Sequence, residues 1–203
     1  MNAASQATPK RLVVGISGAS GADLGIQLLK AMQHLPGWET HLVISEGARR
    51  TIRLETAYSA EEVEALASRC YPLDDVGASI ASGTFKTEGM VVVPCSMKTV
   101  AGIAHGYSQN LLLRAADVVV KERRKLVLVA RESPLSNIHL ANMLQLANAG
   151  IVIMPPVLTY YQRPATIQDM AAHIVGKVLD VFGIELASFK RWDPGSATPQ
   201  SHF

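Results

Sequence analysis

The residues best suited to chemistry in this sequence are glycines and hydroxyls that follow short apolar runs. In residues 11–27 (RLVVGISGASGADLGIQ), an apolar run ends at Ile16 and leads into a glycine- and serine-rich turn. Glycine allows a tight turn and a close approach of backbone to a ligand. Ser17 and Ser20 are expected to cap the next helix and to donate to an anion at its positive end. The turn predicts a site for a phosphate or a flat cofactor, although a glycine turn alone is weak evidence.

A second turn of this kind follows the clearest buried strand of the chain, 89–94. Residues 95–99 (CSMKT) place small hydroxyl side chains before another helix. Arg131 and Glu132 follow a further apolar run, and Tyr160 and Tyr161 lie on a later loop. Ligands of parallel sheets bind beyond the carboxyl ends of the strands, so these groups are expected to converge on one edge. Arg131 suits a bidentate contact with phosphate.

Each of these features also has an ordinary structural interpretation. A serine at a strand end commonly caps a helix, an Arg–Glu pair is commonly a weak surface ion pair, and Cys95 after a buried strand is commonly an inert core thiol. The cations at 121–124 form either a solvated face or part of a positive pocket. Glu55 is expected to be exposed, and becomes a candidate proton donor if burial raises its pKa.

The elements that must position these residues alternate along the chain. Apolar runs predict strands at 12–16, 40–45, 89–94, 125–131 and 151–154, and helical periodicity predicts helices at 21–33, 46–58, 60–69, 110–124, 138–148 and 167–182. Within 70–88 we expect only a short strand, near 78–82. The alternation predicts a three-layer α/β domain with a parallel sheet and helices on both faces. The second strand ends in Ser45 instead of an acidic residue, which argues against NAD.

Composition narrows the function classes. The chain has 203 residues, of which 48% are hydrophobic, and a net charge of +2 with interspersed signs. We therefore expect one domain over 11–192, flexible ends at 1–10 and 193–203, and no nucleic-acid surface. Cys70 and Cys95 make neither a disulfide framework nor a zinc site. The polar N-terminus and the lack of a membrane-length apolar run favour a cytoplasmic protein with no membrane partner.

Four motifs together resemble the UbiX-type flavin prenyltransferase family. They are GISGASGA at 15–22, PCSMKT at 94–99, RAADVVVKERRKLVLVARESP at 114–134 and NAGIVIMPPVLTYYQRP at 148–164. The resemblance implies a flavodoxin-like, Rossmann-like domain in a homo-dodecamer. It also implies that reduced FMN accepts, at N5 and C6, the dimethylallyl group of dimethylallyl phosphate without a metal. The prenylated FMN would serve a UbiD-type decarboxylase.

The resemblance also implies roles for individual residues. The flavin-binding positions are Gly18, Ala19, Ser20, Ser45, Ser96, Met97, Lys98, Thr99 and Arg131, and the phosphate-binding positions are Arg114, Lys121, Arg131, Tyr161 and Lys177. Arg114 is expected to act from a neighbouring subunit. The catalytic positions are Ser20 and Lys121, the proton-transfer acids Glu55 and Glu132, and Trp192, which closes over the prenyl group. Lys177 stands where many relatives have Arg, and it loses the bidentate fork.

Two other functions remain open from the sequence. One is a non-catalytic FMN carrier or accessory subunit of a decarboxylase, which would keep the flavin turns and lose the phosphate-binding cations. The other is a flavin-dependent cysteine decarboxylase of the same fold. Such decarboxylases use an early histidine as base, whereas His34 and His41 lie outside the expected helix.

Overall fold

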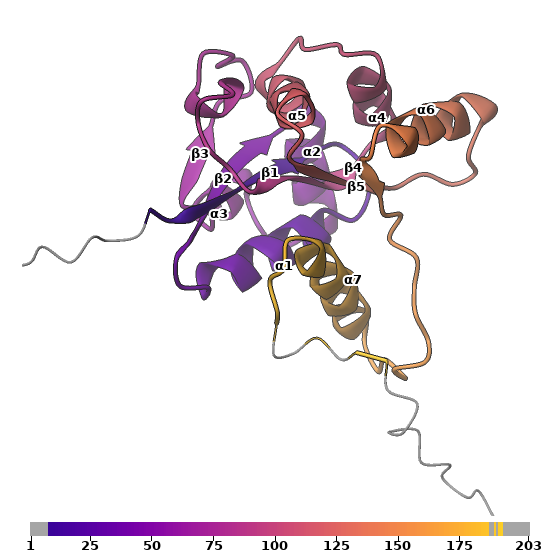
Figure 1. The fold of residues 1–203 in the computed structure, drawn as a ribbon. Coiled ribbons are helices and arrows are strands. Elements are labelled where there is room, and N and C mark those ends of the chain that lie inside the picture. The colour runs from indigo at the N-terminus through magenta and orange to yellow at the C-terminus, as the bar shows by residue number, and fades with distance from the viewer. Residues whose placement is uncertain (1–7, 187–188, 190, 193–203) are drawn as a thin grey trace, which may run out of the picture.

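Six parallel strands form one sheet in the order β3-β2-β1-β4-β5-β6 in the computed structural model (Figure 1). The structure describes residues 8–186, 189, 191 and 192. The strands are β1 (Lys10–Ile16), β2 (Trp38–Ile44), β3 (Arg69–Tyr71), β4 (Gly89–Cys95), β5 (Lys125–Ala130) and β6 (Val152–Ile153). The central strands are buried apolar runs, as strands covered on both faces must be. The predicted parallel α/β architecture is confirmed.

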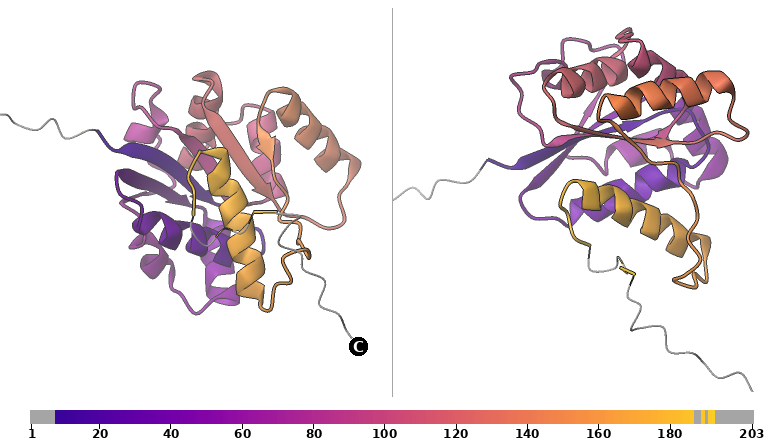
Figure 2. Two further views of the ribbon diagram at one scale, coloured as in Figure 1. Left: turned by 60° about the horizontal axis from the view of Figure 1, so that its bottom comes forward. Right: turned by 45° about the vertical axis from the view of Figure 1, so that its right-hand side comes forward.

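Helices cover both faces of the sheet, as Figures 1 and 2 show. One face carries α1 (Ala22–Gln33), α2 (Glu46–Glu55), α3 (Ala60–Glu64) and α7 (Ile167–Val181). The other carries α4 (Met97–Ala104), α5 (Leu111–Lys121), α6 (Asn137–Asn148) and the 3-10 turn η1 (Ser79–Ala81). No helix within these described residues is long and apolar enough to cross a membrane.

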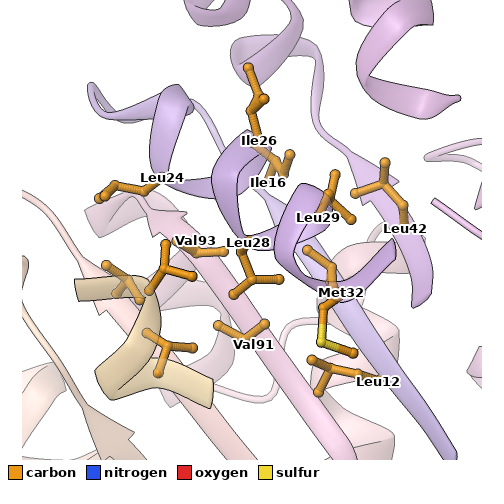
Figure 3. Close-up of a cluster of buried hydrophobic side chains, with 14 of the residues drawn as sticks. Leu12, Ile16, Leu24, Ile26, Leu28, Leu29, Met32, Leu42, Val91 and Val93 are labelled. Atoms are coloured by element: carbon orange, nitrogen blue, oxygen red, sulfur yellow. The ribbon is translucent and has the colours of Figure 1, made fainter. Parts of the chain in front are cut away.

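The two cores follow from the twofold alternation of side chains along each strand. In β4, Val91 and Val93 pack beneath α1 and α7, while Met90 and Val92 face α5. Figure 3 shows Val91 and Val93 against Leu28 of α1. Because β1, β2 and β4 are packed on both faces, their carboxyl ends are fixed relative to one another.

Three sequence expectations about the elements are wrong. The predicted strand near 78–82 is η1, whose Ile80 and Ala81 are buried under α5. The predicted helix 60–69 ends at Glu64, and Arg69–Tyr71 instead pairs with β2 as an edge strand. β1 begins at Lys10, inside the segment expected to be flexible. The remaining predicted flexible residues, 1–7 and 193–203, lie outside the described residues.

Candidate functional site

Ser17 joins the two glycine- and serine-rich turns at the carboxyl edge of the sheet. It is 1% exposed, and its hydroxyl donates to the Pro94 carbonyl at 3.1 Å and accepts from the Ser96 N–H at 2.8 Å. The predicted capping by Ser17 and Ser20 is wrong, because Gly21 is the N-cap residue of α1 and the first N–H groups of that helix donate to Glu55. A rigid hydroxyl bridge therefore sets the spacing between the β1 and β4 turns.

Three helices begin around this bridge, each capped by a polar side chain. Ser45 accepts from the Ala48 N–H at the start of α2, Ser96 from the Thr99 N–H at the start of α4, and Asn110 from the Leu113 N–H at the start of α5. The N-terminus of a helix carries a partial positive charge. The carboxyl edge of the sheet is consequently suited to an anionic group.

Gly18 and Gly47 lie in backbone contact across this edge. A Cβ placed on Gly18 would lie 2.8 Å from the Gly47 Cα, closer than real Cβ contacts allow. Glycine at position 18 is therefore required for the β1 turn to reach the start of α2. The packing of backbone against backbone is therefore enough to explain why glycine stands at position 18.

A pocket of about 760 Å³ opens at this edge. Of the residues expected to bind flavin, Gly18, Ser45, Ser96, Lys98 and Thr99 line it. Leu73, Leu112 and Leu113 add apolar walls that the sequence reasoning missed. A pocket of this size with apolar walls and converging helix N-termini fits a flat ring system that carries a phosphate. We call it the edge pocket.

The other expected flavin-binding residues lie outside the walls of the edge pocket. Met97 is 8% exposed and packs in the core beside α5, and Ala19 is also buried. Ser20 donates a hydrogen bond to the Glu55 carboxylate. Arg131 is exposed after β5, and its N–H donates to the Cys95 carbonyl at 3.0 Å.

Glu55 reaches the start of α1 from 34 positions away in the chain. Its carboxylate accepts from the N–H groups of Gly21 at 2.8 Å and Ala22 at 3.1 Å. Partial burial raises the pKa of Glu55, but hydrogen bonds from Ser20 and from these two N–H groups, with the charge of Arg131, outweigh it and hold the pKa below its ordinary value. The expected route to a proton donor, a pKa raised by burial, is therefore wrong for the free chain.

A second group of expected residues gathers around α7. The ring of Tyr161 lies edge-on to His173 at a centroid distance of 5.9 Å and to Trp192 at 5.1 Å. Burial and the nearby charge of Lys177 lower the pKa of His173. We call Tyr161, His173, Lys177 and Trp192 the α7 cluster; the sequence reasoning missed His173, whose helical spacing to Lys177 was the available signal.

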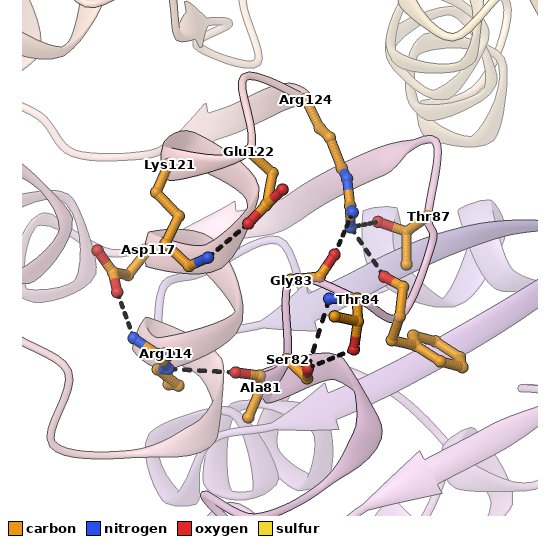
Figure 4. Close-up of polar contacts among 11 residues, drawn as sticks. Ala81, Ser82, Gly83, Thr84, Thr87, Arg114, Asp117, Lys121, Glu122 and Arg124 are labelled. Carbon is orange, nitrogen blue, oxygen red and sulfur yellow. Dashed lines mark hydrogen bonds and ion pairs between the residues drawn. The ribbon is translucent and has the colours of Figure 1, made fainter.

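Arg114 and Lys121 lie on the opposite face of the sheet, on α5 (Figure 4). Arg114 donates to Asp117 at 2.7 Å and to the Ala81 carbonyl at 3.3 Å, and Lys121 pairs with Glu122. The chain does not bring these two cations to Tyr161 or Lys177, because the sheet and its two cores lie between them. Glu132 is exposed on the loop after β5, where it accepts from the Ser133 N–H.

Among the described residues, no group of three or more His, Cys, Asp or Glu side chains is placed to hold a metal ion. Cys70 and Cys95 are both free, and burial raises the pKa of both thiols, to about 11 for Cys70. Neither thiol is poised as a nucleophile at neutral pH.

Comparison with known proteins identifies the family. The model of the Flavoprotein family matches residues 1–181. A probable UbiX-like flavin prenyltransferase from Sedimentibacter hydroxybenzoicus is 55% identical over 183 residues, which cover 90% of this chain and 97% of the relative. The chain belongs to the UbiX-like flavin prenyltransferase family.

Solved structures of the flavin prenyltransferase family share its fold closely. A dodecameric FMN-dependent Ubix-like decarboxylase from Escherichia coli O157:H7 is 53% identical, with a TM-score of 0.89 over 90% of this chain and 99% of that one. AnUbiX (PadA1), in complex with FMN and dimethylallyl pyrophosphate, is 49% identical, with a TM-score of 0.89. The match covers 91% of this chain and 98% of that one. The peptidyl-cysteine decarboxylase EpiD, at 16% identity and a TM-score of 0.57, shares the fold alone.

Proposed function

We propose that this protein transfers the dimethylallyl group of dimethylallyl phosphate to reduced FMN. The observation that carries the proposal is the edge pocket, which has room for a flavin at the meeting point of three capped helix starts. Relatives that match nearly the whole chain are flavin prenyltransferases, and one of them was solved with FMN and a dimethylallyl donor. When bound, reduced FMN supplies the nucleophilic N5 and C6 atoms that accept the prenyl carbons.

The residues of the edge pocket would hold the flavin through small, fixed groups. The hydroxyl oxygens of Ser96 and Thr99 lie 3.1 Å apart at the start of α4. Hydroxyls and N–H groups at a helix start can donate to the flavin phosphate. The glycine contact between Gly18 and Gly47 lets the ring approach the backbone. Leu112 and Leu113 would cover the apolar part of the ring and exclude water.

Cations around the donor would stabilise the departing phosphate. Arg131 lies near enough to Glu55 to lower its pKa, and Lys177 and Tyr161 belong to the α7 cluster. Positive side chains that face the leaving group stabilise the charge that develops on it. A bound phosphate beside Glu55 would be a like charge, which raises the pKa of that carboxyl and favours the protonated form that can assist departure. Glu132 would take the proton released when the new ring closes.

Arg114 and Lys121 can serve this site only from a neighbouring copy. They lie beyond the sheet from the α7 cluster and already pair with Asp117 and Glu122 within their own helix region. We therefore propose a homo-oligomer, by analogy with the dodecameric relative, in which α5 of one copy completes the donor site of another. In a closed symmetric assembly every copy gives and receives the same residues.

The prenylated FMN would serve as the cofactor of a UbiD-type decarboxylase, which is the partner that the resemblance to the flavin prenyltransferases implies. We also propose a cytoplasmic location, since two unpaired cysteines and a reduced flavin both suit a reducing compartment.

Mass spectrometry of the flavin tests the proposal. The protein is incubated without oxygen with reduced FMN and dimethylallyl phosphate, and we expect a flavin heavier by one five-carbon prenyl unit. Tightly bound but unmodified FMN, with the phosphate and the pyrophosphate donor alike, would contradict the proposal and favour the carrier function.

Two variants test the assigned roles. Glu55→Gln and Lys121→Ala are expected to bind FMN as the wild type does and to form little or no product. Lys86→Ala is the matched control, because Lys86 is an exposed lysine in the loop that Arg124 organises, away from the edge pocket. Full product formation by both test variants would refute the roles of Glu55 and Lys121.

A further inference from the structure

Gly176 forms a notch on the buried side of α7. A Cβ at this position would lie 2.2 Å from Cδ2 and 2.7 Å from Cγ of the Phe189 ring. Glycine inside a helix is less favourable than alanine, so its presence here needs a reason. The Phe189 ring packs directly against Gly176, and the side chain of any larger residue would occupy that space.

Aromatic contacts continue from Phe189 to Trp192. The Phe189 ring lies against the His173 ring, with a centroid distance of 5.2 Å and an interplanar angle of 31°. His173 is 7% exposed and meets the edge-on ring of Tyr161, which in turn meets Trp192 at 5.1 Å and 85°. Offset and edge-on pairs of this kind are favourable arrangements of aromatic rings. The rings link the position of Trp192 to the notch at Gly176.

An ion pair fixes the same part of the chain at a second point. The Arg191 guanidinium donates to both carboxylate oxygens of Asp180, at 2.6 and 3.3 Å, and lies 3.6 Å from Glu185. It also lies over the Phe189 ring, 5.4 Å from the centroid. The pair is partly exposed, and isolated surface ion pairs contribute little to stability. The two hydrogen bonds to Asp180 and the contact with the Phe189 ring nevertheless restrict where Arg191 can lie.

We propose that Gly176, Phe189 and the Asp180–Arg191 pair are positioning residues that set Trp192 against Tyr161, beside Lys177. This inference rests on the proposed function. When phosphate leaves dimethylallyl phosphate with the electron pair of the C–O bond, the allylic carbon can be attacked by a water oxygen. That attack releases one proton and yields dimethylallyl alcohol. The indole held at this place excludes water and faces the positive carbon with its π-system.

Gly176→Ala tests the proposal without weakening the helix. Alanine favours α7, but its Cβ displaces Phe189. We expect unchanged FMN binding and helix content, and at least a severalfold higher ratio of dimethylallyl alcohol to prenylated FMN. The matched control is Gln168→Ala on the exposed side of the same helix. An unchanged product ratio in Gly176→Ala would overturn the proposal.

Tryptophan fluorescence provides a readout that does not depend on turnover. The chain has two tryptophans, so Trp38→Phe leaves Trp192 as the only one. Trp192 is 61% exposed, and its ring contacts Tyr161. In the Trp38→Phe background, Gly176→Ala, Phe189→Ala and Arg191→Gln should each loosen this contact, change the Trp192 emission and increase its quenching by acrylamide. Trp192 emission that is identical in all three variants would contradict the positioning roles, even if the wild type formed no prenylated flavin.

An exchanged ion pair separates positioning from a simple loss of charge. Asp180→Arg and Arg191→Asp are each expected to raise the share of alcohol, and their combination should restore most of the wild-type ratio. Combined variants no better than either single variant would exclude the pair as a positioning device. If the wild type makes prenylated FMN and all these ratios stay constant, the inference fails while the proposed function stands.

Discussion

The walls of the edge pocket come from turns and helix starts that contact one another within a single chain, whereas the residues expected at the donor phosphate are spread over both faces of the sheet. Ser17 bridges the two turns by hydrogen bonds of 3.1 and 2.8 Å. Lys121 and Lys177, in contrast, lie on α5 and α7, with two hydrophobic cores between them.

This difference indicates which part of the site one chain can complete. Backbone N–H groups and small hydroxyls are placed by the sheet itself, so the edge pocket is formed as soon as the domain folds. Long cationic side chains are placed by whichever helices meet, including those of another copy. The single chain accordingly keeps Arg114 and Lys121 paired with acidic neighbours, Asp117 and Glu122.

The largest expected effect on FMN binding comes from disrupting the edge pocket. In Gly18→Ala the new Cβ must move Gly47 and the start of α2, which both line the edge pocket. We expect FMN affinity to fall at least severalfold, as measured by fluorescence titration. Gly77→Ala is the control, because its Cβ would meet only Asp75, at 3.6 Å. Equal affinities for the two variants would show that the Gly18–Gly47 contact is not needed.

The second prediction concerns sharing of the site between copies. Lys121→Ala and Lys177→Ala are each expected to be inactive. When the two are co-expressed and mix at random, about a quarter of the sites should contain both lysines, because each must come from the right chain at even odds. Tyr161→Ala mixed with Lys177→Ala is the control and should regain nothing, since both residues lie in the α7 cluster of one chain. Prenylated FMN per site reports the result; no recovery in the first mixture would place Lys121 outside the shared site.

A smaller effect is expected at position 177 itself. Lys177→Arg restores the bidentate fork and keeps the charge. We expect a fall of a few-fold in the KM for dimethylallyl phosphate with little change in kcat, measured by steady-state kinetics without oxygen. Lys86→Arg serves as the control. An increase in KM would mean that the site is fitted to the shorter side chain of lysine and gains nothing from the two-donor guanidinium of arginine.

The smallest effect concerns stability. Glu55→Gln removes the negative charge at the start of α1, and we expect the free energy of unfolding at neutral pH to fall by about 0.3–1 kcal/mol. Because the folded pKa of Glu55 lies below its ordinary value of 4.5, this contribution is present above that value and is lost as pH falls through the folded pKa. Urea unfolding of both proteins between pH 7 and the acid range measures it. A difference that persists in acid would assign the effect to lost packing.

The core elements were predictable because their signals are local. The apolar run ending at Ile16 and the one over 89–94 each favour a buried strand wherever they lie. β3 was missed because Arg69–Tyr71 has no apolar run and is a strand only through its pairing with β2. The strand expected near 78–82 failed because burial beneath α5 accounts for Ile80 as well as a strand does.

The sequence by itself determined the parallel α/β order and the residue types at the strand ends, because apolar periodicity and helix caps act over a few residues. Tertiary structure alone decided that Glu55 is an ionised cap of α1, that Phe189 lies in the Gly176 notch, and that the cations of α5 and α7 are apart. These facts depend on contacts between residues distant in the chain. No local pattern encodes such contacts, since they form only when the packing of helices on the sheet brings the two partners together.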